Sequence, residues 1–205
     1  MAAVVEIEAR VQEAVAAGDF GAAALAGLDG YGHGLYRFVF AITRDPDLAD
    51  DAYSLVCENM WTGLPGFRGQ GSFHSWVYRI ARHAGLRVLA DPKRRRERNL
   101  SLSDAPEALA MAQRIRTETR PHLKSEVKRH VRHLREQLTT DEQMLLTLRV
   151  DRQMSWVEIT DVLSDGDLAA DERTAVTAKL RKRFERTKTR LRRLVENSPV
   201  DAAGG

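Results

Sequence analysis

The feature that most constrains the fold is the spacing of apolar residues, which recur at steps of three and four along almost the whole chain. The strict alternation that is typical of strands is absent. Each helix then has one apolar face, so the chain is predicted to be all-α. Glycines between Gly27 and Gly34 are expected to loosen the approach to the second helix, and Pro65-Gly66 to end the third. The expected helices cover about 3–17, 31–43, 46–62, 73–90, 123–138, 140–150, 155–163 and 172–196.

The helices are expected to form two small bundles, which a chain of 205 residues can accommodate. Between them lies the stretch Asn99–Pro121, which contains serines and prolines and has weak apolar periodicity. It is interpreted as a flexible linker with a short helix near 107–117. The predicted organisation is therefore a first domain over 1–98, a linker over 99–122, a second domain over 123–197 and a tail over 198–205.

Several classes of protein do not fit this sequence. With Cys57 as its one cysteine, the chain has no disulfide framework. No apolar run approaches the ~18 residues of a membrane helix, and the N-terminus does not resemble a signal peptide, so a cytoplasmic protein without membrane contact is expected. His130 and His133 lack further metal ligands, and the glycines of 66–71 lack the Lys-Ser/Thr of a phosphate loop. We therefore expect no enzyme, no metal and no cofactor.

The C-terminal part has the pattern of a helix-turn-helix. Two capping boxes, Thr140 with Gln143 and Ser155 with Glu158, predict two short helices joined by the tight connection 151–154. The last helix then carries ten Lys/Arg against four acids between residues 171 and 197. In such a motif the N-terminal part of the second helix enters the major groove, which would place Thr174, Arg181 and Lys182 on DNA. A solvated basic helix is the alternative reading.

A second basic segment, Lys93–Arg98, has five bases and one acid. It follows a predicted helix on which Arg79 and Arg82 project away from the apolar face, with aromatic residues at its start. Cations that follow phosphates and rings that stack on bases are what single-stranded nucleic acid requires. Trp76 is expected to belong mainly to the core, whereas Phe73 and Tyr78 could serve either purpose.

The stretch Asp45–Glu58 has the opposite character, with five acids and no base on an amphipathic helix. DNA would repel this face, so it is expected to meet a protein. A plain solvated face is the alternative.

Two segments together resemble the extracytoplasmic-function (ECF) group of the sigma-70 family. The first, Asp45–Arg98, joins the acidic helix, a Phe-containing loop, the pattern F-x-x-W-x-Y-R-I-A-R and the arginine cluster; the second runs from Leu134 to Leu194 and contains KLRKRFERTKTRLRRL. The resemblance implies an RNA polymerase sigma factor, which directs core polymerase to promoters and assists DNA melting. The first domain would be its region 2 and the second its region 4. Its partners would be core RNA polymerase and promoter DNA, and the existence of an anti-sigma factor is left open.

The resemblance also implies roles for particular residues. Polymerase would be bound by Asp50, Asp51, Ser54 and Glu58. The −10 element would be bound by Phe67, Arg68, Ser72, Phe73, Arg79, Arg82, His83, Arg87, Arg94 and Arg95. The −35 element would be bound by Arg173, Thr174, Thr177, Arg181 and Lys182.

The chain departs from the family pattern at several positions. His83 stands where the family usually has Asn, Arg87 where it has Asp, and Ser54 where Gln is frequent; 164–172 is longer than the usual turn before the recognition helix. Two other functions remain open. A helix-turn-helix regulator that is not a polymerase subunit would explain the second domain, and a helical RNA-binding adaptor would bind without sequence preference.

Overall fold

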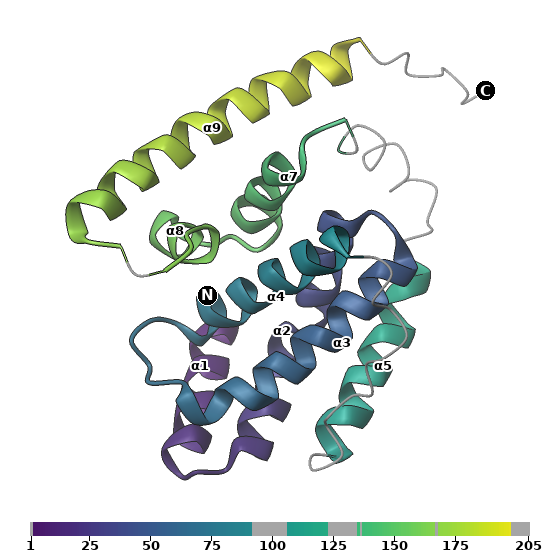
Figure 1. Ribbon diagram of the computed structural model, residues 1–205, viewed down its shortest axis with the longest axis vertical. Helices are drawn as coiled ribbons and strands as arrows, with labels where there is room; N and C mark the ends of the chain where they lie inside the picture. The colour runs from purple at the N-terminus through teal and green to yellow at the C-terminus, as the bar shows by residue number, and fades with distance from the viewer. Residues whose placement is uncertain (1, 92–105, 123–134, 136, 167, 198–205) are drawn as a thin grey trace.

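The computed structural model describes residues 2–91, 106–122, 135, 137–166 and 168–197, and this part of the chain is helical, without strands, as predicted (Figure 1). The first five helices lie together in the lower half of Figure 1, and a long last helix crosses above two short ones. The helices are α1 (Ala2–Ala16), α2 (Phe20–Thr43), α3 (Pro46–Gly63), α4 (Phe73–Ala90), α5 (Pro106–His122), α7 (Thr140–Leu146), α8 (Trp156–Leu163) and α9 (Ala170–Glu196).

Helix α2 begins at Phe20, so the prediction that it starts near residue 31 was wrong. Asp19 caps its first turn by accepting a hydrogen bond from the backbone N–H of Ala22. The glycines do not break this helix; they let neighbouring side chains approach it. A Cβ atom would lie 2.7 Å from Phe73 at Gly27, 2.4 Å from Ile7 at Gly30 and 2.4 Å from Ile115 at Gly32. Helix α2 is therefore the central helix, which α1, α3, α4 and α5 surround.

The described part of the predicted linker is helix α5, which is longer than the expected 107–117. It lies against α2 and α3, and its buried apolar side chains are Ala108, Ala112 and Ile115. The boundaries of the two domains stay a prediction, but residues 106–122 belong by contact to the first group of helices.

The short helices of the C-terminal part begin where they were expected, with one difference in the caps. Ser155 and Glu158 form the predicted capping box of α8. At α7, however, the box is formed by Thr139 and Glu142, one residue before the predicted pair Thr140 and Gln143. Gln143 is instead buried and donates a hydrogen bond to the backbone oxygen of Arg135. The predicted helix 123–138 lies almost entirely outside the described residues.

A tight turn joins α7 to α8, as the sequence predicted. The last turn of α7 widens over Thr147–Asp151, and Gln153 then adopts a left-handed conformation with φ 55°. Met154 is buried beneath the turn, where Arg149 donates a hydrogen bond to its backbone oxygen at 2.7 Å. Across the resulting corner, the rings of Trp156 and Phe184 meet edge to face at 5.6 Å and join α8 to α9.

The C-terminal helices lie directly on the first group. Helix α8 packs along α4, and α7 packs against α2. Arg44, the left-handed residue after α2, donates a hydrogen bond to the backbone oxygen of Leu138 at 2.6 Å. The buried residues of both groups consequently form one continuous core.

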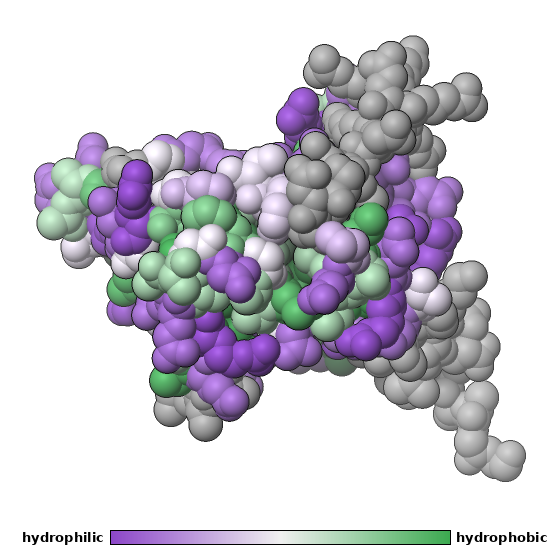
Figure 2. Space-filling view, turned by 90° about the horizontal axis from the view of Figure 1, so that it is seen from below, coloured by the Kyte–Doolittle hydropathy of each residue, from purple (hydrophilic) through white to green (hydrophobic). Residues whose placement is uncertain are grey.

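The outer surface is mixed in character. The face drawn in Figure 2 has apolar patches near its centre that hydrophilic side chains border. Apolar patches of limited extent are ordinary on protein surfaces. Within the described residues, none of the helices is both long and apolar enough to cross a membrane.

Candidate nucleic-acid interface

The start of α4 is held by caps from two directions. Ser72 accepts a hydrogen bond from the backbone N–H of Ser75, which is an ordinary N-cap. The Glu8 carboxylate, from α1, accepts hydrogen bonds from the backbone N–H groups of Phe73 and His74, both at 2.8 Å. Tyr31 donates a third hydrogen bond to Glu8 at 3.0 Å. An acid at a helix N-terminus is favourable, so this contact fixes the loop before α4 and the direction of the helix.

The aromatic residues at this end form a cluster. Phe67 in the loop lies 5.1 Å from the ring of Trp76 and 5.6 Å from that of Phe73. Phe73 and Tyr78 are fully buried, so both belong to the core in this arrangement, whereas Trp76 is only partly buried. A base could reach Trp76 at the surface, but contact with Phe73 would require the loop to rearrange.

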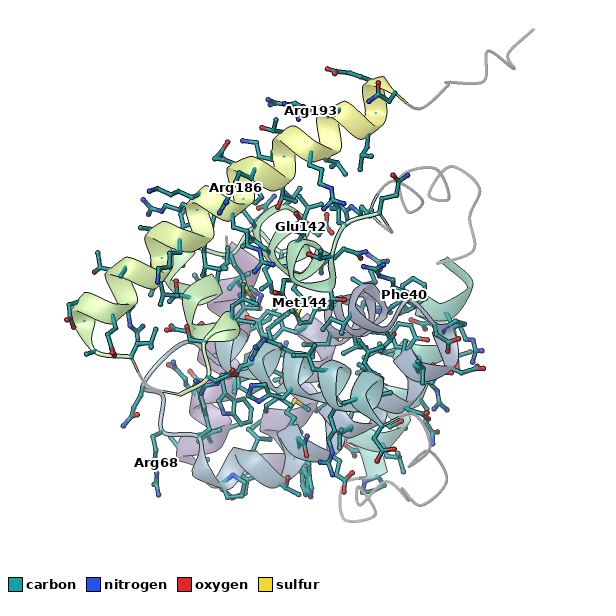
Figure 3. All side chains as sticks on the ribbon, turned by 45° about the horizontal axis from the view of Figure 1, so that its top comes forward. Phe40, Arg68, Glu142, Met144, Arg186 and Arg193 are labelled. Carbon is teal, nitrogen blue, oxygen red and sulfur yellow. The ribbon has the colours of Figure 1, made fainter. Side chains whose placement is uncertain are left out.

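A cavity of about 210 Å³ lies beside this cluster. The loop 66–72 and Trp76 form one side, with Arg68 and Arg79, while Asp161 of α8 and Arg173 of α9 form the other. Arg68 projects outward from the loop in Figure 3. Burial raises the pKa of Asp161, and Arg173, which donates a hydrogen bond to it at 2.6 Å, opposes that shift. The cavity thus combines an aromatic wall with cations, a combination suited to a nucleotide.

The basic face of α4 is occupied by acids from the C-terminal part. Arg82 and His83 both bind Asp165, at 2.6 and 3.3 Å, in the turn after α8. The hydrogen bond from Arg82 lowers the pKa of Asp165. Arg87, one turn further along α4, is exposed. Arg94 and Arg95 lie outside the described residues.

A second contact connects the N-terminal end of α4 to α8. His74 is buried, stacks on Tyr31 at 4.7 Å, and lies 3.3 Å from Glu158 of α8. Ser72 donates a hydrogen bond to the same carboxylate at 3.3 Å. The hydrogen bond from His74 lowers the pKa of Glu158 to about 2, with the caps of Ser155 adding to the effect. Glu158 therefore caps α8 and is also hydrogen-bonded to Ser72 and His74 of the α4 end.

The sequence predicted Glu158 only as a cap of α8, and Asp161 and Asp165 were not singled out. Their spacing of three and four places them on one side of α8 and its following turn, and Arg79 and Arg82 repeat at three on α4. That matching spacing could have indicated a contact between the two helices. The local sequence, however, does not show which helix packs against which.

The predicted −35 residues divide into two groups on α9. Arg173 is bonded to Asp161, and the Thr177 hydroxyl lies 2.8 Å from that of Thr160, so both join α9 to α8. Thr174, Arg181 and Lys182 are exposed. Arg181 also lies over the ring of Trp156, 5.7 Å from its centre.

Further along α9, the basic side chains face outward. Arg186 and Arg193 lie on the outer side of the helix in Figure 3, away from α7, where Glu142 and Met144 are found. Two basic residues turn inward instead: Arg183 pairs with Asp141 and Arg190 with Glu142, both at 3.0 Å. A cationic surface therefore remains along the helix after these pairs have formed.

The residues on the acidic helix α3 that were predicted to bind polymerase differ in their surroundings. Asp50 accepts hydrogen bonds from Tyr36 and from Arg120 of α5, and only 17% of its side chain is exposed. Ser54 donates a hydrogen bond to the backbone oxygen of Asp50, while Asp51 and Glu58 are partly buried.

Among the described residues, no group of three or more His, Cys, Asp or Glu could hold a metal ion; His130 and His133 lie outside them.

Comparison with known proteins gives two findings. Residues 29–96, from α2 through α4 to the arginine cluster, match the family model described as Sigma-70 region 2. The chain is also 27% identical over 136 residues to the RNA polymerase sigma-H factor of Pseudomonas aeruginosa, across 65% of this chain and 70% of that protein. The matched segment contains the acidic helix, the aromatic loop and the basic helix α4. Residues 29–96 of this chain are therefore similar to region 2 of the sigma-70 family.

Proposed function

We propose that this protein is a sigma factor of the ECF group, which binds core RNA polymerase, directs it to specific promoters and assists the opening of DNA. The observation that carries this proposal is the match of residues 29–96 to Sigma-70 region 2. The same segment carries an acidic surface and a basic aromatic surface on adjacent helices. In this proposal the protein works in the cytoplasm and performs no chemical reaction itself.

The loop 66–72 and the exposed edge of Trp76 would receive an unpaired base of the −10 element. Unstacking a base costs a few kcal/mol, which a prepared pocket can offset. Arg68 and Arg79 line the cavity and would meet the adjoining phosphates. Arg82, His83 and Arg87 would extend this contact along α4, and the remaining −10 residues stay predictions.

The outer surface of α9 would bind the −35 element as duplex. The helix begins at Ala170, so Thr174 lies in its second turn, and Arg181 and Lys182 follow two turns later. Entry of the N-terminal half of α9 into a major groove would bring these side chains to base edges and phosphates. Arg173 and Thr177 would act by holding α9 on α8.

The −10 surface on α4 cannot bind DNA in the arrangement described above, because α8 lies on it, whereas the outer surface of α9 remains exposed. Asp165 and Asp161 lie where phosphates would lie beside Arg82 and Arg79. We infer that the C-terminal helices move away from α4 when the protein binds a promoter.

Two single substitutions test how the surfaces are divided. Asp51→Ala should weaken binding to core polymerase and leave the binding of isolated −35 duplex unchanged. Arg181→Ala should weaken duplex binding, by about 1–3 kcal/mol if it reads a base, and leave polymerase binding unchanged. The measurements are affinity for purified core polymerase and for a labelled duplex. Equal loss of the same function in both variants would overturn the division.

The second candidate is a helix-turn-helix regulator that is not a polymerase subunit, and the basic helix α9 after two capped short helices favours it. A regulator of this kind does not explain the acidic helix α3 beside the aromatic loop. Binding to core polymerase separates the two candidates, because the regulator would bind duplex DNA specifically without it.

A further inference from the structure

Helix α5 is held on α2 by closely fitted contacts. The side chain of Ile115 is buried and rests against Gly32, where a Cβ atom would lie 2.4 Å from it. The Thr119 hydroxyl is fully buried and bonds to the ring of His33 at 2.7 Å. These contacts define one register of α5 along α2, so the position of the residues that follow Thr119 is also set.

That register brings Arg120 onto the acidic helix. Its guanidinium donates hydrogen bonds to Asp50 and, at 2.8 Å, to Asp47. The hydrogen bond from Arg120 to Asp47, with the nearby Asp50, raises the pKa of the arginine. On the other side of Asp50, the Tyr36 hydroxyl donates a hydrogen bond at 2.7 Å. The Asp50 carboxylate is thus fully engaged within the chain.

The engaged carboxylate belongs to the surface that we propose for polymerase. An acidic helix attracts a basic partner, and a partner's arginine would approach Asp50 from the side that Arg120 now occupies. Arg120 therefore takes the place of a cation from the partner. With Tyr36 on one oxygen of Asp50 and Arg120 on the other, the carboxylate is 17% exposed, so a cation from the partner would compete with Arg120 for the same side of it.

The contact of α5 with the acidic surface of α3 is smaller than its contact with α2. Among its described side chains, the buried apolar ones are two alanines and Ile115, and Leu109 and Met111 pack against the core while partly exposed. The Arg120 pairs are partly open to solvent, with 41% of the Arg120 side chain and 61% of the Asp47 side chain exposed. Exposed ion pairs contribute little to stability, and a helix of this length is marginal when alone.

We propose that α5 is a built-in competitor of polymerase: it covers the N-terminal part of the acidic surface of α3 in the free protein and leaves it when polymerase binds. This inference rests on the proposed sigma-factor function. It assigns α5 a regulatory contact in addition to connecting the two groups of helices. The affinity for polymerase is then reduced by the fraction of molecules in which α5 is docked.

The first test is the affinity of full-length variants for core RNA polymerase. Arg120→Ala should bind more tightly than the unsubstituted protein, by up to about fivefold, because an exposed ion pair contributes up to about this factor. The control is Arg114→Ala on the same helix, whose ion pair is with Glu118 of α5 itself. It removes the same charge and should bind as the unsubstituted protein does. Equal or weaker binding by Arg120→Ala would overturn the proposal.

The second test follows α5 directly by amide hydrogen exchange in the unsubstituted protein. Adding core polymerase should speed exchange along 106–122 while the amides of α3 become slower. Binding that leaves α5 protected overturns the competitor role and leaves the sigma-factor function standing. Absence of any binding to polymerase overturns that function itself, and this inference with it.

Discussion

At the scale of the residue, Gly27 is one of the positions in α2 where the fold leaves no room for a side chain. A Cβ atom there would lie 2.7 Å from the buried ring of Phe73. We expect Gly27→Ala to lower the free energy of unfolding by about 1–3 kcal/mol, because a rigid aromatic core cannot yield. Gly21→Ala on the same helix is the control: its Cβ would meet Asp19 at 3.4 Å, an ordinary contact. It should leave stability unchanged or raise it by up to about 1 kcal/mol. Urea denaturation measures both, and equal effects would contradict the close approach.

Glu158 makes the stability of the folded protein depend on pH in the acidic range. Its pKa falls from 4.5 to about 2 in the folded protein, so the stability it contributes is present above about pH 4.5 and is lost as the pH falls toward 2. We expect the urea midpoint of the unsubstituted protein to drop between about pH 5 and pH 3 more steeply than that of Glu158→Gln. Identical pH dependence in both would show that the pair with His74 contributes nothing.

At the scale of the element, the caps of α7 test where that helix begins. Thr139 accepts a hydrogen bond from the backbone N–H of Glu142, and Glu142 accepts one in return from that of Thr139. Thr139→Ala should destabilise the protein by about 1 kcal/mol, as the loss of an N-cap does. Thr140→Ala, at the first helical residue, should have almost no effect. Thermal unfolding of both variants measures these effects. A larger loss of stability in Thr140→Ala than in Thr139→Ala would instead support the cap that was predicted from the sequence.

The sequence predicted most helices because their apolar periodicity is local information. Helices α3, α4, α8 and α9 lie within two residues of their predicted bounds. Helix α2 was predicted too short, because glycine is a poor helix former and its use at Gly27, Gly30 and Gly32 depends on distant partners. The length and docking of α5 were missed for a related reason, since Ile115 and Arg120 act through contacts with α2 and α3.

At the scale of the whole molecule, the contact of α8 with α4 controls access to the basic face. Asp165→Asn removes the shared partner of Arg82 and His83. It should therefore tighten the binding of a single-stranded oligonucleotide by a few-fold, which fluorescence anisotropy measures. Asp171→Asn, an exposed acid on α9, makes the same change in net charge elsewhere. An equal gain in both variants would mean that net charge alone is responsible.

This arrangement could not be predicted from the chain, although the basic and acidic residues were visible in it. Arg82 and Asp165 are 83 positions apart, and neither the sequence around α4 nor that around the turn after α8 identifies its partner. On α9, the candidate residues Thr174, Arg181 and Lys182 are exposed, in agreement with the basic pattern of the sequence. On α4, Arg82 and His83 are instead paired with Asp165 in the turn after α8, while Arg87 is exposed.

Reconstituted transcription is the direct test of whether this protein starts transcription as a polymerase subunit. The purified protein would be mixed with core RNA polymerase and genomic DNA fragments, and run-off transcripts would be mapped. The account predicts a stable complex and transcripts that begin at discrete sites, with none from core polymerase alone. Specific binding to duplex DNA without a polymerase complex or discrete transcripts would contradict it and favour a regulator that acts outside the enzyme.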